Sequence, residues 1–246
     1  MSVESERDLE GLKAIGRIVA ETLRLLRAQV APGVTTGRLD EIAGRFLRRH
    51  GARSAPQLTY AYPGVACISV NDEAAHGIPG SRRLAPGDVV KLDVSAERDG
   101  FFADAAVTLG VPPVSKATAV LIRAARDARD AGIRAAVAGQ PISAIGQAAE
   151  AVAREGGFVV IADLPGHGLG RALHEAPSVP QNYDPTATAP LTDGLVITIE
   201  PHLTTGDGTL SEDRDGWTLR TRNRARVAQF EHTIVVTRQQ PILITA

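Results

Sequence analysis

The sequence predicts an α+β fold in which residues 1–246 form a single domain. Apolar residues recur at helical spacing in several segments, and apolar runs rich in β-branched residues lie between and after these segments. No linker or low-complexity stretch separates the two halves of the chain. Hydrophobic residues make up 43% of the sequence, which is enough for a substantial core.

Two helices are expected at the start of the chain. The first extends from about Glu6 to Gln29, where apolar residues such as Leu12 and Leu23 recur at helical spacing. The sequence APGVTT ends this helix, and Thr36 is expected to cap a second helix that stops at Gly51. Short segments that contain Pro and Gly follow.

The stretch VVKLDVSAERDGFFADAAVTLG, from Val89 to Gly110, predicts a β-hairpin that turns near Asp99-Gly100. Asp93 and Asp104 lie within its strands. A four-residue loop would place the two acids directly opposite each other, a two-residue loop would make them diagonal neighbours on one face, and a three-residue loop would separate them onto opposite faces. The first two loops bring like charges together, which destabilises a fold unless a cation lies between them.

The second half of the chain repeats the order of the first. An alanine-rich helix is expected over residues 117–138, and Ser143 is expected to cap a following helix that stops at Gly156. The segment Gly33–Gly51 aligns with Gly139–Gly157, and apolar residues and an arginine coincide. We interpret this as two similar helix–helix–strand halves, although unrelated helix pairs share such patterns by chance.

Acids recur in the later strands. Glu200 ends the apolar run LVITIE, and Glu231 lies between AQF and HTIVVT. An acid in a strand is usually a surface residue, but four acids in four apolar strands are harder to explain in this way, because a buried, unpaired acid costs several kcal/mol. His167 lies in the glycine-rich sequence PGHGLGR, where a histidine is usually only a turn residue.

Together these residues form a candidate metal site. Oxygen and nitrogen ligands without a thiolate suit manganese, cobalt, iron, nickel or zinc. Five protein ligands are too many for one catalytic ion, which needs an open position, and are about right for two ions bridged by carboxylates. The predicted ligands are Asp93, Asp104, His167, Glu200 and Glu231.

Composition excludes several classes of partner and compartment. Lys and Arg number 27 against 28 Asp and Glu, so the net charge of -1 gives no signal for nucleic-acid binding. The single cysteine, Cys67, fits a reducing compartment. The N-terminus does not resemble a signal peptide, and no apolar run is long enough for a membrane span. A cytoplasmic protein is expected, and because no feature demands an oligomer, so is a monomer.

The motifs resemble those of the methionine aminopeptidase family, of the compact bacterial kind with the pita-bread fold. The matching stretches occur in the family's order and include CISVNDEAAHGIP, GHGLGRALHEAP, VITIEP, DGWT and AQFEHTIVVT. The resemblance implies a curved sheet common to both halves and hydrolysis of the N-terminal methionine from peptides and nascent proteins by a pair of divalent metal ions.

The resemblance also implies individual roles. Asp93 would chelate one ion, Asp104 and Glu231 would bridge both, and His167 and Glu200 would complete the ligand shell of the second ion. His76 and His174 would bind the substrate and, with Glu200, take part in catalysis. The methionine pocket would involve Tyr62, Cys67, Leu173 and Trp217, with Tyr60 as a further candidate.

Five positions depart from the family pattern. Leu173 stands where the family generally has Phe, and Ala105 and Ala106 follow Asp104 where a hydroxyl residue is common. Lys91 stands where a neutral polar residue is typical; it shares a strand face with Asp93 and could compete for that carboxylate. His202 occupies a place usually given to an apolar residue. The departures suggest a divergent or second copy with altered rate or preference.

Two other readings remain open from the sequence. A peptidase that cleaves X-Pro bonds shares the scaffold, but such enzymes usually carry an extra N-terminal domain, and only about 60 residues precede the first motif here. A non-catalytic binding relative would have lost metal ligands, whereas all five ligand positions are present.

Overall fold

The helices form where the apolar spacing predicts them. The computed structural model describes residues 1–246. Its helices are α1 (Glu6–Arg27), α2 (Thr36–Arg49), α3 (Ala55–Tyr60), α4 (Lys116–Ala135) and α5 (Ser143–Glu155). The short helix α3, in a segment rich in Pro and Gly, gave no periodic signal in the sequence because it is only six residues long.

The strands fall into four hydrogen-bonded sheets. The first contains β1 (Arg53–Ser54), β4 (Val89–Arg98), β2 (Cys67–Val70) and β5 (Phe101–Gly110). The second contains β13 (Val227–Gln229), β10 (His202–Thr204) and β6 (Val159–Val160). The third contains β11 (Leu210–Glu212), β12 (Leu219–Thr221) and β3 (Glu73–Ala75). The fourth contains β15 (Ile242–Leu243), β14 (His232–Val235), β9 (Val196–Ile199), β7 (Gly166–Gly168) and β8 (Glu175–Val179).

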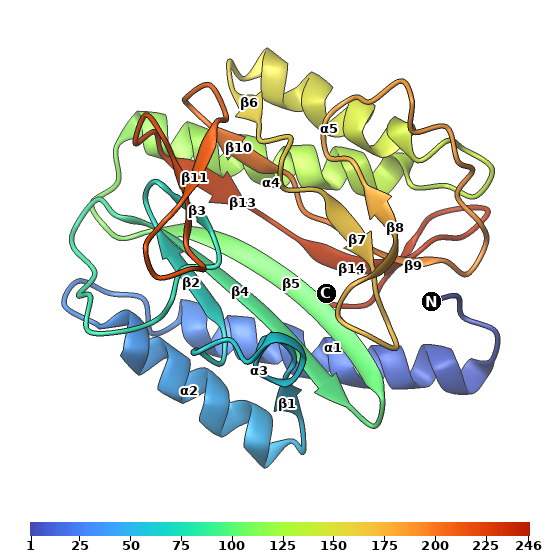
Figure 1. The fold of residues 1–246 in the computed structure, drawn as a ribbon, viewed down its shortest axis with the longest axis horizontal. Coiled ribbons are helices and arrows are strands. Elements are labelled where there is room, and N and C mark those ends of the chain that lie inside the picture. The colour runs from blue at the N-terminus through green and yellow to red at the C-terminus, as the bar shows by residue number, and fades with distance from the viewer.

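The helices cover the outside of the strands. Figure 1 shows α1 and α2 along one side of the sheets and α4 and α5 along the other, with β4, β5, β13 and β14 between the two helix pairs. Each half therefore consists of a helix pair that packs on strands, as the sequence predicts. The predicted α+β arrangement of two helix pairs around common strands is therefore present (Figure 1).

The helix α1 shows why the apolar spacing forms a helix here. Leu12, Ile15, Val19, Leu23 and Leu26 lie on one face and are buried against the first sheet. The side chain of the preceding serine accepts a hydrogen bond from a first-turn amide and caps the helix. The helix ends two residues earlier than predicted, because the chain turns out of it before the next proline.

Two predicted caps are wrong. Thr35, not Thr36, caps α2: its Oγ1 accepts a hydrogen bond from the amide of Arg38 at 3.1 Å, while Thr36 begins the helix and bonds Gly80 instead. Ser143 is the first residue of α5, which has no side-chain cap. A hydroxyl residue near a helix start marks the boundary only to within one or two residues.

The backbone supports the similarity of the two halves. Gly33 and Gly51, which bracket α2, and Gly139 and Gly157, which bracket α5, all have φ between 67° and 91°. This left-handed conformation favours glycine, because a Cβ is disfavoured there. The aligned glycines thus form equivalent turns around equivalent helices.

The sheets of the two halves meet at β5. The amide of Glu231 donates to the carbonyl of Ala106 at 2.9 Å, and Thr108 Oγ1 donates to the carbonyl of Gln229 at 2.6 Å. Two residues before Ala106, Thr233 Oγ1 accepts from the amide of Asp104 and donates to its carbonyl. The common curved layer is therefore joined by individual bonds rather than by one continuous ladder.

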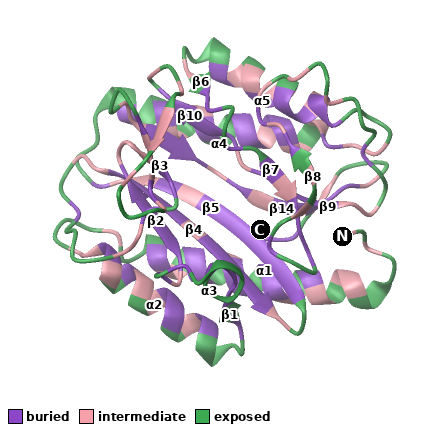
Figure 2. Cartoon of the chain, in the orientation of Figure 1, coloured by how far each residue is buried: buried purple, intermediate pink, exposed green.

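The core lies mainly between α1, α2 and the first sheet. Figure 2 shows β4 and β5 buried along almost their whole length, in contrast to the outer faces of the helices. Smaller apolar clusters lie under α4 and α5. The strands that carry the acids are thus shielded from solvent on both faces.

None of the helices combines the length and the apolar character that crossing a membrane requires.

Candidate metal centre and active site

The hairpin places Asp93 and Asp104 on one face. The strands pair Asp93 with Ala106 and Ser95 with Asp104, so the turn is the two-residue loop among the three considered. Asp99 and Gly100 form this turn with φ of 54° and 80°, values that match the twist of a tight hairpin. The two acids are therefore diagonal neighbours that share a face.

Glu231 reaches the same place from the other half of the chain. It lies between β13 and β14, and its backbone amide bonds β5 at Ala106. The two bonds between Thr233 and the backbone of Asp104 hold β14 in register with β5. Contacts between residues more than 120 positions apart thus fix the separation of Asp104 and Glu231.

His167 and Glu200 form the opposite side of the site. His167 Nε2 lies 3.5 Å from Glu200 Oε1. Thr198 supports both, because its Oγ1 accepts from the amide of His167 at 2.9 Å and donates to Glu200 Oε1 at 2.7 Å. His167 Nδ1 lies 3.0 Å from the carbonyl of Gly168, which can only accept. Nδ1 therefore carries the proton, and the lone pair of Nε2 is free to bind a metal.

The four carboxylates repel one another. Burial raises the pKa of Asp93 to about 6 and the pKa of Glu200 to about 8. Burial, followed by repulsion from the neighbouring acids, raises the pKa of Asp104 and of Glu231 well above the usual range. Burial lowers the pKa of His167 to about 4, so its ring is neutral at cellular pH. No lysine or arginine pairs with any of the four acids; their one such contact is that of Glu200 with neutral His167.

The donor atoms fit divalent metal ions. One ligand atom each from Asp104, His167 and Glu231 lie within 4.8 Å of one another. Asp104 Oδ1 and Glu231 Oε1 are buried and have no hydrogen-bond partner, which is costly unless another group binds them. Asp93 and Glu200 lie outside this group of three but line the same cavity as Asp104 and His167. The predicted ligands thus converge around a position that demands positive charge.

A cavity of about 570 Å³ opens above the acids. The predicted pocket residues Tyr62, Cys67, Leu173 and Trp217 all line it. Tyr62 and Trp217 meet edge to face, with ring centroids 5.1 Å apart, and the hydroxyl of Tyr62 donates to the carbonyl of Gly77 at 2.6 Å. Leu173 is buried against Phe102 in a small apolar cluster, so one side of its chain faces the core. The wall of the cavity beside the acids is therefore apolar.

Two histidines stand at the cavity surface as expected. His76 and His174 are both exposed and line the cavity. His76 has φ of 56°, a conformation that is uncommon outside glycine and often occurs at functional sites. The ring of His174 lies 4.1 Å from the ring of His167, centroid to centroid, so it stands directly beside the proposed ligands.

Tyr60 has a contact that sequence reasoning did not find. Its hydroxyl lies 2.6 Å from Nδ1 of His174, and this contact joins α3 of the first half to the residue that precedes β8 in the second. The two residues are 114 positions apart in the sequence, so no local pattern predicts that they meet. Gln229 was also missed, although it lines the cavity and lies in the stretch that carries Glu231.

Replacing Tyr60 by phenylalanine is expected to lower kcat/KM about 2- to 12-fold, because a neutral hydrogen bond contributes a net ~0.5–1.5 kcal/mol. Steady-state kinetics on Met-Ala-Ser, a peptide of the class that the family resemblance implies as substrate, measures the effect. Tyr183→Phe serves as the control, since Tyr183 is equally exposed and its hydroxyl makes no hydrogen bond. Equal kcat/KM in the Tyr60 variant and the wild type would show that the contact has no effect on the substrate site.

Two departures from the family pattern lie beneath the cavity. Lys91 does not bind Asp93, although its place on the same strand face made that competition possible: its Nζ bonds the carbonyls of Asn71 and Val227, each at 3.1 Å. His202 lines the cavity and is 1% exposed, and neither ring nitrogen has a partner. Burial lowers the pKa of His202 to about 3 and keeps its ring neutral.

The model of metallopeptidase family M24 matches residues 10–238 of this sequence. The chain belongs to this family. This M24 metallopeptidase chain is 45% identical over 247 residues to methionine aminopeptidase 2 of Bacillus subtilis, and the alignment covers 100% of this chain and 99% of the relative. It is 40% identical over 251 residues to a methionine aminopeptidase of Staphylococcus epidermidis, with 100% and 98% covered.

Solved structures agree with these relatives. A methionine aminopeptidase from Thermotoga maritima matches the M24 metallopeptidase with a TM-score of 0.96 and 31% identity over 100% of this chain and 99% of that chain. Prolidase from Pyrococcus furiosus matches with a TM-score of 0.78 at 18% identity, over 99% of this chain and 65% of that chain, and shares the fold alone. The predicted family, its pita-bread fold and the assignment as a metal-dependent hydrolase are confirmed.

Proposed function

We propose that this metallopeptidase removes the N-terminal methionine from peptides and nascent proteins. The observation that carries the proposal is the meeting of two environments in one cavity: a cluster of partnerless acids at its floor and an apolar wall beside them. The curated relatives that match the whole chain are named methionine aminopeptidases, which supports the same substrate.

The proposal includes two divalent ions, because four carboxylates and one imidazole exceed what one catalytic ion with an open position requires. Asp93 would hold one ion, His167 and Glu200 the other, and Asp104 and Glu231 both. The partnerless oxygens of Asp104 and Glu231 support the bridging assignment, since each carboxylate has an oxygen left over for a second partner. Oxygen and nitrogen donors suit cobalt, manganese, iron, zinc or nickel.

Bound divalent ions would supply a nucleophile at neutral pH and polarise the scissile carbonyl. The chain supplies the remaining steps. The ionised carboxylate of Glu200 would accept a proton from the attacking water and pass it to the leaving amine. His76 donates a hydrogen bond to the carbonyl oxygen as negative charge develops there. His174, oriented by Tyr60, bonds the substrate backbone.

The pocket selects the first side chain by apolar contact. Tyr62, Cys67, Leu173 and Trp217 would surround the methionine side chain and exclude water from it. An apolar pocket discriminates by about 1–3 kcal/mol for a missing methylene, so the preference over alanine is expected to be large. Because Leu173 replaces an aromatic residue in one wall of the pocket, the strength of the preference for methionine depends on this position.

We further propose that the protein is a monomer with a single catalytic domain and that it is located in the cytoplasm. The main apolar cluster contains residues of both halves, such as Leu12 and Val94 together with Val196 and Val235, which supports one domain. The single cysteine is buried and free, as is common in proteins of reducing compartments. Sedimentation of the purified protein would measure the oligomeric state.

A peptide panel tests the substrate assignment. Met-Ala-Ser is expected to release free methionine, at a kcat/KM at least about tenfold above that for Ala-Ala-Ser, because the pocket binds the longer apolar side chain. Ala-Pro is the counter-substrate for a proline peptidase. Hydrolysis of Ala-Pro in preference to Met-Ala-Ser would assign the site to that class, and near-zero metal after reconstitution would indicate a non-catalytic relative.

A further inference from the structure

Lys91 lies where a charged or amine side chain is least expected. It is in the middle of β4, within the first sheet, and only 1% of its surface is exposed. Its Nζ donates to two backbone carbonyls, that of Asn71 and that of Val227, each at 3.1 Å. An ammonium has three N–H donors and a neutral amine has two, so both bonds are possible whatever the charge of the side chain.

The two carbonyls belong to separate segments. Asn71 lies in the turn between β2 and β3, with φ of 60°, and Val227 is the first residue of β13. The amide of Val227 also donates to the carbonyl of Asn71 at 3.1 Å. Lys91, Asn71 and Val227 therefore form a three-way joint that ties β4, the β2–β3 turn and β13 together.

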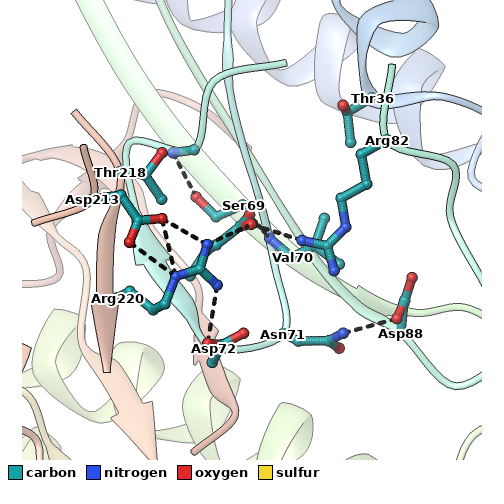
Figure 3. A network of polar contacts seen from close by, with 12 residues as sticks. Thr36, Ser69, Val70, Asn71, Asp72, Arg82, Asp88, Asp213, Thr218 and Arg220 are labelled. Carbon is teal, nitrogen blue, oxygen red and sulfur yellow. Dashed lines mark hydrogen bonds and ion pairs between the residues drawn. The ribbon is translucent and has the colours of Figure 1, made fainter. Parts of the chain in front are cut away.

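The turn is fixed from its outer side by a separate network. Figure 3 shows the side chain of Asn71 bonded to Asp88, and Arg220 between Asp72 and Asp213. These contacts hold the turn against the loops around it, but they do not reach β13. Lys91 adds side-chain bonds to the backbone bond between Asn71 and Val227, and so reinforces the connection from this braced turn to the strand that leads to Glu231.

Each arm of the joint leads to the active site within a few residues. Lys91 precedes Asp93 on β4, Asn71 is followed by β3 and then His76, and Val227 begins the strand that is followed by Glu231. A shift of one segment against another would therefore change the spacing of these three side chains. Catalytic and metal-binding groups tolerate such shifts poorly, because small misplacements carry large costs in rate.

We propose that Lys91 is a positioning residue for the metal centre: its Nζ joins the Asn71 and Val227 carbonyls and so sets where Asp93, His76 and Glu231 stand. This inference rests on the proposed metallopeptidase function. Lys91 thus places a buried amine that bonds two segments at a position where a neutral polar residue is typical of the family.

Lys91→Met, which keeps the length of the side chain and removes its donors, tests the proposal. The metal dissociation constant is expected to rise about 10- to 100-fold, the range found when groups that orient metal ligands are removed. We expect kcat on Met-Ala-Ser to fall at least about tenfold while KM changes less than about twofold, since the apolar wall is untouched. Amide hydrogen exchange at Val227 is expected to accelerate at least about tenfold.

The control is Arg98→Met, at the exposed end of the same strand, which is expected to match the wild type in all three measurements. Lys91→Gln, which retains two N–H donors on a shorter chain, is expected to lie between Lys91→Met and the wild type. Lys91→Ala adds a rescue arm, because the vacated space matches n-propylamine, and buried apolar cavities bind small molecules of fitting shape. n-Propylamine should restore kcat, whereas tetramethylammonium at equal ionic strength should not.

Wild-type kcat and metal affinity in Lys91→Met would overturn the proposal, and so would a fall in Tm with both values unchanged, because that is the signature of a purely structural residue. If Lys91→Met does not fold, the intermediate kcat of Lys91→Gln and the amine response of Lys91→Ala decide the question. A wild-type enzyme inactive on every peptide would contradict the proposed function instead, while metal affinity and hydrogen exchange still measure the joint.

Discussion

Asp104→Ala and Glu231→Ala are each expected to lower turnover of Met-Ala-Ser more than about 100-fold with metal added, because changing even the groups that support metal ligands costs 10–100-fold. Both residues are buried, and each has an oxygen without a partner. Peptide hydrolysis and elemental analysis after metal reconstitution measure the loss of activity and of bound metal together.

The same variants have a second expected effect, of opposite sign. In the metal-free protein, each substitution removes one of four acids that repel one another. Burial, followed by this repulsion, raises the pKa of Asp104 and of Glu231. The metal-free variants are therefore expected to have a higher Tm at pH 8 than the metal-free wild type. A rise in Tm together with a loss of activity separates a metal ligand from a residue that is needed for folding.

Glu41→Ala is the control for these variants, because it removes an exposed carboxylate on α2 that pairs only with surface arginines. It should leave activity, metal content and Tm unchanged. Unchanged turnover of Asp104→Ala and Glu231→Ala would refute the proposed two-ion centre. A lower Tm of both metal-free variants would show that the acids are neutralised within the fold by some other means.

The increase in Tm on adding divalent metal to the chelator-treated protein is expected to grow from pH 5.5 to pH 8. Burial raises the pKa of Asp93 from 3.8 to about 6 and the pKa of Glu200 from 4.5 to about 8 in the folded, metal-free protein. The folded state therefore holds more protons than the unfolded state between about pH 4 and pH 8, and this cluster loses stability as the pH rises through that window.

Metal ions reverse this loss, because they bind the ionised carboxylates. The shift at Asp93 alone corresponds to ~3 kcal/mol at pH 8, at 1.36 kcal/mol for each pKa unit. Comparing the protein with and without metal at each pH cancels the contribution of buried groups outside the site, such as His232. Calorimetric titration in buffers of different ionisation enthalpy should also show protons released on metal binding near pH 6.5.

Thermal unfolding at pH 5.5, 6.5 and 8, with chelator or with metal, measures the pH dependence. Asp104→Ala serves as the matched control, since a site without this acid should gain little from metal at any pH. A metal-induced rise in Tm that stays constant or shrinks toward pH 8 would mean that the acids are already ionised in the metal-free fold.

Local pattern was sufficient for much of the fold and of the candidate site. The 3.6-residue apolar spacing of α1 and α2 and the alternation along β4 and β5 follow from which faces can be buried, and burial is a local property of the pattern. The acids were recognisable because a carboxylate within an apolar strand is costly unless it is compensated. The predicted cap at Thr36 was wrong because the neighbouring hydroxyl of Thr35 caps the helix instead, and the predicted cap at Ser143 was wrong because α5 begins at that serine without a side-chain cap.

Other features depended on the tertiary structure. The choice among three hairpin turns, which decides whether Asp93 faces Asp104, followed from the observed strand register. The hydroxyl of Tyr60 contacts His174, and the amine of Lys91 contacts the carbonyl of Val227. In each pair the two residues are more than 100 positions apart in the sequence. Sequence by itself determined which residue types must be neutralised and which faces must be buried. Only the packed chain decided which groups meet, because the partner of a buried polar atom is selected by geometry and not by its neighbours in sequence.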